Sequence, residues 1–526
     1  MSAAILALLQ EGAALQMRGA LGEAERRFKA VLKADPGDFN ALHLLGVVRI
    51  QQGRHADAER LISRALERNP RSAEARNNLA NALLALGRNE DAAAACRAAL
   101  ALQPAYAEAH DALGLALQRL GRLEEALACH RRALECKPDL ATAHNNIGLI
   151  LETRGELHEA ASRFERALAL RPGFADAWSN LGNVHKARGQ LQEALACYDR
   201  AIGAAPGHPQ AQWNASLAHL LRGDLARGFA GYEWRRRVPG TEHARPRPGR
   251  SWLGETDPRG KTLLVHEEQG HGDTIQFVRY VPLLAQTGAR VVLEVVPSLV
   301  PLMRSLAGVE RLVATGTAVG RIDLHCPVMS LPHALAAAVA GIPAQVPYLQ
   351  PPPERAERWR ERLGPRRGLR VGLAWSGSRA HKDDRNRSIA LARLAPLLAL
   401  RGVEWFGLQP DVRDADRSTL ESMPALRDLG PDLADFADTA CAIAELDLVI
   451  SVDTSVAHLA GALAKPVWIL LPFAPDWRWQ LERSDSPWYP TAELFRQRVA
   501  GAWDAVIEVV HARLAARAIA SAAAPR

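Results

Sequence analysis

Three short segments of the chain combine residue types that group-transfer chemistry needs. Residues 268–274, 376–388 and 451–458 each follow an apolar run and each lead into a helical pattern. The first joins two glycines to an aspartate, the second gathers basic side chains, and the third runs from Asp-Thr-Ser to a histidine. Carboxylates and imidazoles move protons, and basic side chains with free backbone amides hold phosphate oxygens.

In the first segment, Gly270 and Gly272 let the backbone approach a ligand, and Asp273 falls at the start of a helix. An aspartate at this place is either a helix cap or a carboxylate held as a general base, and spacing leaves both interpretations open. His266 and His271 raise the question of a metal. The two zinc-binding histidines of helical metalloenzymes are four residues apart, whereas these two are five apart, so we expect no metal site.

The second segment lies between a strand pattern and a helix pattern and carries four cations within nine residues. Its hydroxyl and basic candidates for phosphate binding are Ser378, Lys382, Arg385 and Arg387. The alternative is a solvent-exposed loop, because two aspartates lie among these cations and cancel their charge. The Gly-Lys-Ser/Thr run of a Walker A loop is absent.

In the third segment an apolar strand turns directly into a helix. The residues Asp453, Thr454 and Ser455 stand at the turn, where free amides and the positive end of the helix dipole favour a diphosphate. His458 lies one turn into the helix. It is either a ligand contact or a core histidine with its own hydrogen-bond partners.

These segments need a scaffold that brings them to one edge, and strand and helix patterns alternate after residue 260. The predicted strands are 262–266, 290–296, 369–375, 403–408, 446–452 and 467–471. The predicted helices are 274–286, 299–306, 331–340, 354–363, 391–400 and 455–463. Such alternation predicts parallel sheets with helices on both faces. A run of three prolines at 351–353 separates two Rossmann-like units, 261–350 and 351–526, with a ligand cleft at the carboxyl ends of their strands.

Residues 1–238 follow a different period, of 34 residues. Prolines recur at 36, 70, 104, 138, 172 and 206, and glycines at 19, 53, 87, 121, 155, 189 and 223. Small residues recur five positions after these glycines and again in a second phase that includes residues 46, 114, 148 and 182. Paired helices that pack at small residues, turn at glycine and end before proline give the tetratricopeptide pattern, so we expect an α-helical solenoid of about seven units. Residues 239–260, rich in arginine, proline and glycine, are expected to be a linker.

Four asparagines share one phase of the first helix in each pair. They are Asn78, Asn146, Asn180 and Asn214, with Leu44 and Ala112 in the same phase of other units. They form either polar helix surface and bonds between repeats, or an amide ladder that grips the backbone of an extended peptide. The ladder resembles the repeat domain of the eukaryotic O-linked N-acetylglucosamine transferase, although many tetratricopeptide sequences have this asparagine.

Length and composition limit the remaining classes. The chain has 526 residues, enough for three or four cores, and its charged share of 23% with 48% apolar residues is that of a folded protein. The net charge of +7 suits an anionic small ligand but does not indicate nucleic acid. Six scattered cysteines, the lack of a basic leader and the lack of a long apolar run predict a cytoplasmic protein without a transmembrane segment.

The loop at 270–273, and the run from Asp453 through His458 to residues 462–466, resemble the heptosyltransferase-type glycosyltransferases of family 9. With the segment 472–479 (Pro-Phe-Ala-Pro-Asp-Trp-Arg-Trp), the whole arrangement resembles bacterial proteins that fuse tetratricopeptide repeats to such a domain. The resemblance implies a GT-B fold and an inverting, metal-independent glycosyltransferase without a cofactor. It also implies a nucleotide-sugar donor and a protein acceptor recruited by the repeats.

The resemblance also assigns roles. It makes Asp273 the base that acts on the acceptor hydroxyl, and it places the donor diphosphate at Asp453, Thr454, Ser455 and His458. A basic residue of the second segment would neutralise the leaving diphosphate, with Lys382 expected first and Arg385 and Arg387 as alternatives.

The chain departs from the family in three places. Its amino-terminal transferase half, 261–350, is short, so we expect the repeats to supply the acceptor site that this half normally shapes. Ser455 stands where the family usually has glycine, and residues 386–389 replace a lysine-aromatic-proline element. Two other functions therefore stay open: a scaffold protein that keeps the transferase fold without catalysis, and a sugar transferase of the lipopolysaccharide core whose repeats are an adaptor.

Overall fold

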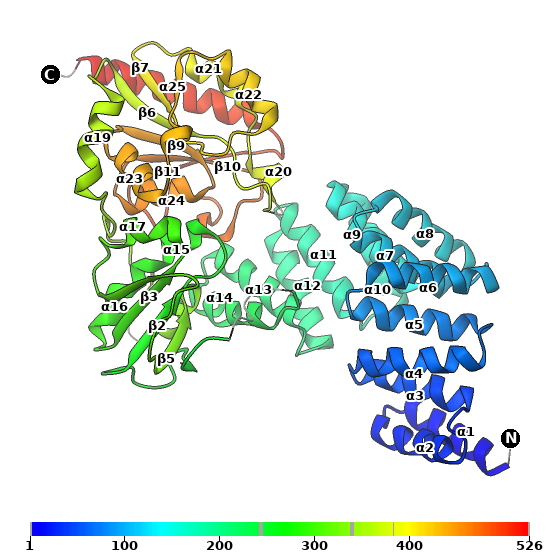
Figure 1. The fold of residues 1–526 in the computed structure, drawn as a ribbon. Coiled ribbons are helices and arrows are strands. Elements are labelled where there is room, and N and C mark those ends of the chain that lie inside the picture. Colours follow the sequence, from blue (N-terminus) through cyan, green and yellow to red (C-terminus); the bar gives the residue numbers. More distant parts are fainter. Residues whose placement is uncertain (1–2, 241–245, 337–340, 382, 524–526) are drawn as a thin grey trace. The chain divides into compact units, whose positions relative to one another are not determined.

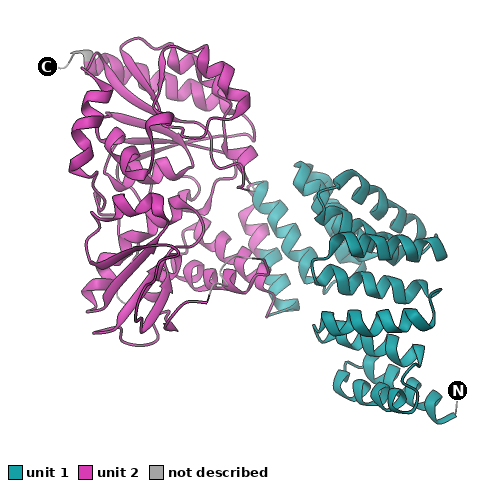
Figure 2. Cartoon of the chain, in the orientation of Figure 1, with its two compact units in different colours: residues 1–188, 196–206 teal, residues 189–195, 207–526 magenta. Residues whose placement is uncertain are grey.

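The computed structural model describes residues 3–240, 246–336, 341–381 and 383–523, and it contains two compact units (Figures 1 and 2). Unit 1 comprises residues 1–188 and 196–206, and unit 2 comprises residues 189–195 and 207–526. In the described ranges, no helix is both long enough and apolar enough to cross a membrane.

The 34-residue period corresponds to helical pairs. Their helices are α1 (Ala3–Met17), α2 (Leu21–Ala34), α3 (Phe39–Gln51), α4 (His55–Arg68), α5 (Ala73–Ala85), α6 (Asn89–Leu102), α7 (Ala107–Arg119), α8 (Leu123–Cys136), α9 (Ala141–Arg154), α10 (Leu157–Leu170), α11 (Ala175–Ala187), α12 (Leu191–Ala204), α13 (Pro209–Arg222) and α14 (Leu225–Tyr232). Every periodic glycine, from Gly19 to Gly223, has φ between 74° and 90° and makes the turn inside a pair. That conformation is strained for other residues, which explains why glycine recurs there.

Where the second small position of a pair in unit 1 is a glycine, it faces one large side chain of the following helix. A Cβ added to Gly46, Gly148 or Gly182 would lie within 2.6 Å of Ile62, Phe164 or Tyr198 respectively. These three large residues occupy the same register of the 34-residue period, and each is fully buried. The 34-residue period therefore reflects a repeated contact between a small residue of the first helix and a large residue of the second.

This packing predicts opposite effects for two glycine substitutions in the same pair of helices. In Gly182→Ala the new Cβ would lie 2.5 Å from Tyr198, so we expect a loss of about 1–3 kcal/mol in the free energy of unfolding. Gly203 in α12 has no atom within 4 Å of the position of an added Cβ, so Gly203→Ala should stabilise by up to about 1 kcal/mol. Urea unfolding followed by circular dichroism measures both, and equal effects would contradict the packing.

Unit 2 contains two parallel sheets. Their strands are β1 (Arg250–Ser251), β2 (Thr262–His266), β3 (Arg290–Val295), β4 (Val309–Ala314), β5 (Leu324–Pro327), β6 (Leu369–Ala374), β7 (Val403–Gly407), β8 (Leu426–Asp428), β9 (Leu448–Val452), β10 (Val467–Leu471) and β11 (Ala492–Arg496). All strand pairings within the two sheets are parallel. The six predicted strands are confirmed to within about two residues, while β1, β4, β5, β8 and β11 were not predicted.

Most of the predicted helices of unit 2 are shorter in the structure, whereas the predicted helices 354–363 and 455–463 are confirmed to within one residue. The helices that follow the repeats are α15 (His271–Phe277), α16 (Val281–Gln286), α17 (Val300–Met303), α18 (Leu331–Ala334), α19 (Pro353–Leu363), α20 (Asp384–Arg387), α21 (Ala395–Leu398), α22 (Asp414–Glu421), α23 (Phe436–Ala444), α24 (Ser455–Ala462) and α25 (Trp503–Ala523). Three of the 3-10 turns between elements are used below: η1 (Glu233–Arg237), η4 (Val328–Ser330) and η7 (Trp477–Trp479). The predicted helix 274–286 is divided by a 3-10 turn ahead of Pro282, and the predicted helix 331–340 is helical over Leu331–Ala334, with 337–340 outside the described residues.

The strand order of each sheet reverses at one point. The first sheet has the order β1-β5-β2-β3-β4 and the second β11-β10-β9-β6-β7-β8. Counted from β6, the second sheet follows the order 3-2-1-4-5-6 of the Rossmann fold. Ligands of such sheets bind outside the carboxyl ends of the strands at the reversal, here between β2 and β5 and between β6 and β9. All three segments singled out in the sequence follow one of these four strands.

The last helical pair belongs to unit 2, although its sequence continues the repeat period. Phe229 of α14 packs edge-on against Trp477, with ring centroids 6.0 Å apart, and against Phe277 at 6.4 Å. The core of unit 2 therefore runs from this pair into both sheets. The predicted linker 239–260 contains β1, which pairs with β5 at the edge of the first sheet.

Candidate functional site

The first and third segments meet where α15 packs on α24. A Cβ added to Gly272 would lie 2.9 Å from His458 Cδ2 and 3.3 Å from the Cα of Ser455. This glycine therefore lets the start of α15, which carries Asp273, come against the start of α24. Two segments of the predicted site, one from each sheet, are thus brought together.

Asp273 bonds both to the N-cap residue of its helix and to an arginine. Its Oδ2 accepts a hydrogen bond from the backbone N–H of Gly270 at 2.8 Å, and its Oδ1 pairs with Nη2 of Arg478. Burial raises the pKa of the Asp273 carboxyl, against the opposing charge of Arg478. The side chain keeps 20% of its exposure. Asp273 is thus not the N-cap residue expected as the alternative: Gly270 occupies that position, and Asp273 accepts its N–H from the third helical position. The role of base stays a prediction.

Arg478 is the functional candidate that sequence reasoning missed. It lies in η7, 6% exposed, and its Nε donates to Oε1 of Gln276 at 2.6 Å while its Nη1 bonds to Asp476 at 2.8 Å. Its guanidinium stands 4.4 Å from the ring centroid of Trp477. The signal was an arginine between two tryptophans in a segment already noted for its resemblance. Trp477 and Trp479 are buried, so they serve as core here rather than as an open stacking surface.

Asp453 and His458 form the part of the site contributed by the second sheet. Oδ1 of Asp453 lies 3.9 Å from Nε2 of His458, while Nδ1 of His458 bonds to the hydroxyl of Tyr489 at 2.9 Å. Burial, with the nearby charge of Asp476, raises the pKa of Asp453 to about 6. Burial lowers the pKa of His458 well below its usual value, so this imidazole is neutral. It stacks on Trp479, with ring centroids 5.4 Å apart.

The start of α24 has no side-chain cap. Thr454 occupies the N-cap position without making a capping hydrogen bond, and its hydroxyl lies 3.1 Å from that of Ser451 instead. Thr454 and Ser455 are half-buried. First-turn amides at such a helix start are available to an anion.

The basic segment contributes Arg387 to this helix start. Nη1 of Arg387 donates to the backbone oxygen of Asp453 at 3.0 Å, and its guanidinium lies over Gly377, whose added Cβ would stand 2.5 Å from Nη2. Ser378 accepts a hydrogen bond from the backbone of Ala380 at 3.4 Å. Lys382, the cation expected first from the resemblance, lies outside the described residues.

Arg385 faces a pocket of about 520 Å³ beside the same segment. Arg413, from the loop after β7, also lines this pocket and bonds to Ser388 at 2.9 Å and to Asp384. Sequence reasoning offered no ground for selecting Arg413, because it lies outside the three segments. The pocket therefore has arginines from the loops of two neighbouring strands, partly balanced by aspartate.

The two histidines considered for a metal lie apart. His266, at the end of β2, lies beside His325 with tilted rings whose centroids are 5.5 Å apart, whereas the His271 ring packs against Phe436 at 5.1 Å. Within the described ranges, no three His, Cys, Asp or Glu side chains are grouped as metal ligands would be.

The periodic asparagines join neighbouring repeats. In each of three cases the amide Nδ2 bonds to a side chain 35 residues earlier. The pairs are Asn78 with His43 (2.9 Å), Asn146 with Asp111 (3.1 Å) and Asn180 with Asn145 (2.9 Å). The Oδ1 of Asn214 accepts a hydrogen bond from Nε2 of Gln210, within the same helix, at 2.9 Å. The bond between repeats, one of the two interpretations of this phase, is therefore present. Peptide binding by the same side chains stays a prediction.

Comparisons with known proteins match the repeats. Residues 9–62, 43–107, 145–209 and 179–240 match one tetratricopeptide-repeat family, and residues 106–172 match a second of the same description. Protein FlbA of Caulobacter vibrioides is 28% identical over 282 residues, which are 49% of this chain and 46% of FlbA. The chain thus matches less than half the length of that relative.

Solved structures that resemble the chain include MamA and a thermophilic tetratricopeptide protein of Thermus thermophilus. Each is 30% identical; MamA covers 31% of this chain and 94% of its own, with a TM-score of 0.28, and the Thermus protein covers 35% and 100%, with a TM-score of 0.33. The family matches show that residues 9–240 are tetratricopeptide repeats, a protein-interaction module, and an α/β region with two parallel sheets follows them.

Proposed function

We propose that the chain is an inverting, metal-independent glycosyltransferase of GT-B type that moves a sugar from a nucleotide-sugar donor to a protein recruited by the repeats. The observation that supports this most is the convergence of Arg387, the uncapped start of α24 and Asp273 at the reversal points of two parallel sheets. Sheets of this type bind ligands at that place.

In this proposal the donor diphosphate lies against the first-turn amides of α24. Arg387 stabilises the negative charge that develops when the bond between the anomeric carbon and the diphosphate oxygen breaks. Asp273 takes the proton of the acceptor hydroxyl as its oxygen bonds to that carbon. Both Asp273 oxygens have a partner, so the proton goes to a lone pair that neither Gly270 nor Arg478 occupies.

Thermal unfolding against nucleoside diphosphates and nucleotide sugars, without added metal, tests the donor site. At a hundredfold excess over Kd we expect about 2.7 kcal/mol of stabilisation by one nucleotide class. Arg387→Gln should weaken that Kd about 10- to 100-fold, because a charged hydrogen bond is lost. The control is Arg393→Gln, an exposed arginine paired to Asp504 in the same half, which should bind as the parent chain does.

Asp273→Asn separates catalysis from binding. It should keep the nucleotide affinity and lose sugar transfer, because an amide can accept the Gly270 bond but takes up no proton at neutral pH. Failure of every nucleotide to stabilise a chain that unfolds cooperatively would overturn the transferase and favour a scaffold protein with a transferase-like fold.

A further inference from the structure

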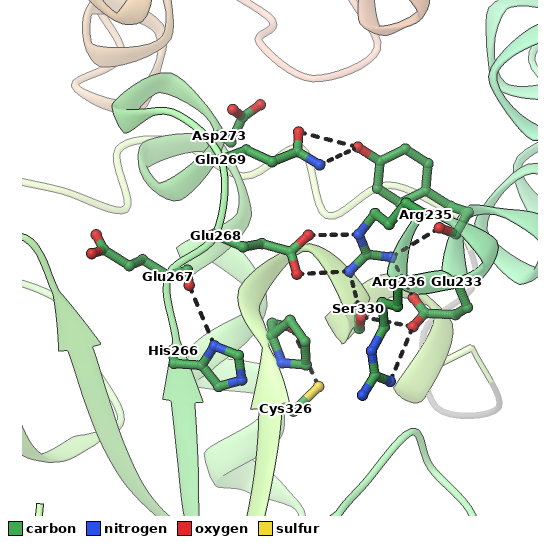
Figure 3. A network of polar contacts seen from close by, with 12 residues as sticks. Glu233, Arg235, Arg236, His266, Glu267, Glu268, Gln269, Asp273, Cys326 and Ser330 are labelled. Atoms are coloured by element: carbon green, nitrogen blue, oxygen red, sulfur yellow. Dashed lines mark hydrogen bonds and ion pairs between the residues drawn. The ribbon is translucent and has the colours of Figure 1, made fainter. Parts of the chain in front are cut away.

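The end of the last repeat places a fully buried arginine at the carboxyl edge of the first sheet. Arg235 of η1 has no exposed surface, and it pairs with both carboxylate oxygens of Glu268, Nε to Oε1 at 2.6 Å and Nη2 to Oε2 at 2.9 Å (Figure 3). It also bonds to Glu233 at 2.9 Å and to the hydroxyl of Ser330 at 2.7 Å. A buried arginine with this many partners fixes the segments that supply them.

The segments that Arg235 joins are the two sides of the reversal point in the first sheet. Glu268 comes two residues after β2, and Ser330 ends η4, which follows β5. Ser330 in turn donates to Glu233 at 3.0 Å, so η1 is bonded to both sides. The repeat period assigns this stretch to the end of the repeats, yet its side chains lie at the carboxyl edge of a sheet.

A second contact reaches further toward Asp273. Gln269 has φ of 63°, a left-handed conformation that residues with a Cβ rarely adopt. Its side chain and the hydroxyl of Tyr232, at the end of α14, exchange hydrogen bonds at 2.9 and 3.3 Å (Figure 3). The next residue, Gly270, donates its backbone N–H to Asp273. Tyr232 is thus two contacts from the candidate base.

We propose that Tyr232 and Arg235 are positioning residues, which hold the loop 268–272 so that Asp273 faces the start of α24. Arg235 fixes the beginning of the loop and Tyr232 holds its disfavoured turn at Gln269. The end of the last helical pair therefore holds the loop that carries the candidate base. Sugar transfer needs this pair even where the repeats recruit no acceptor. The catalytic part of this inference rests on the proposed function.

Tyr232→Phe in the full chain tests the proposal without removing a buried charge. Hydrogen–deuterium exchange should show the amides of residues 269–272 exchanging about three- to tenfold faster, because one hydrogen bond of the loop is lost. Tyr280→Phe is the matched control, since Tyr280 is also buried in this half but stacks on Phe277. It should leave the exchange of the loop unchanged.

A double-mutant cycle identifies the bond responsible. Gln269→Ala should raise exchange as much as Tyr232→Phe, and the double variant should add little to either, because both remove the same contact. Effects that add, or a loop that exchanges at the parent rate in Tyr232→Phe, would overturn the positioning role whatever reaction the chain catalyses.

Kinetics with the nucleotide sugar found in the binding screen tests the catalytic part. Tyr232→Phe should lower kcat for hydrolysis of the nucleotide sugar, in which water takes the place of the acceptor hydroxyl, about tenfold. The donor Kd, set by α24 and Arg387, should stay at the parent value. Loss of donor affinity in step with kcat would overturn positioning. If no nucleotide binds the parent chain, the proposed function fails, and the exchange experiment still decides whether Tyr232 holds the loop.

Discussion

Arg478→Leu should lower the free energy of unfolding by about 3–5 kcal/mol, the usual result when one member of a buried ion pair is removed. The leucine would leave the carboxylates of Asp273 and Asp476 without their shared cation and Oε1 of Gln276 without its donor. Because Arg478 and Asp273 come from the two sheets of unit 2, the loss also removes a bond that joins them. Urea unfolding followed by intrinsic tryptophan fluorescence measures the effect, since three tryptophans pack nearby.

Arg483→Leu is the matched control. Arg483 pairs with Asp485, whose side chain is 71% exposed, so its removal should change stability by less than about 1 kcal/mol. The double variant Arg478→Leu/Asp273→Asn should recover part of the loss, because it removes one of the unpaired charges. Equal effects of the two arginine substitutions would contradict the account of Arg478 as the central cation of the site.

The loops of the site could be predicted because local sequence determines them. A strand that turns directly into a helix leaves amides at one place, and parallel sheets gather such turns at one edge. Arg478 could not be found in this way. It lies 205 residues from Asp273, and only the packing of the two sheets brings the side chains together.

The repeats show the same division between local and long-range information. The period identified every turn glycine, because a left-handed turn excludes other residues. It did not show that α13 and α14 pack with unit 2, since a repeat pattern reports the geometry inside a pair. The aromatic face of α14, with Phe229 and Tyr232, decides that packing through its contacts with Trp477.

The asparagine phase was visible in the sequence, but its partner was not identified. The hydrogen-bond acceptor lies one position earlier in the preceding unit and varies between histidine, aspartate and asparagine. A search for identical residues at the repeat period misses a partner that keeps its place and changes its type. The hydrogen bond depends on how helices of neighbouring repeats pack, which the period alone does not give.

Asp453→Asn should stabilise the chain at pH 7.5 and have little effect near pH 4. The pKa of Asp453 is raised to about 6 by burial, above the ordinary value of about 3.9 in an unfolded chain. The folded state therefore favours the protonated acid, and stability falls as the pH rises from about 4 through 6. The difference between the two pKa values means that burying the ionised carboxylate costs the folded chain about 3 kcal/mol at neutral pH. Asparagine carries no charge, so Asp453→Asn avoids this cost.

Thermal unfolding from pH 4 to 8 measures this effect, and Asp485→Asn supplies a control of opposite sign. The ion pair with Arg483 lowers the pKa of the exposed Asp485, so its small contribution to stability is present at neutral pH and is lost on acidification. If the stability of Asp453→Asn differed from that of the parent chain by the same amount at every pH, burial would not be raising the pKa of this carboxyl. A gain at neutral pH would mean that an ionised Asp453 is kept at the expense of stability, as is typical of residues retained for binding or catalysis.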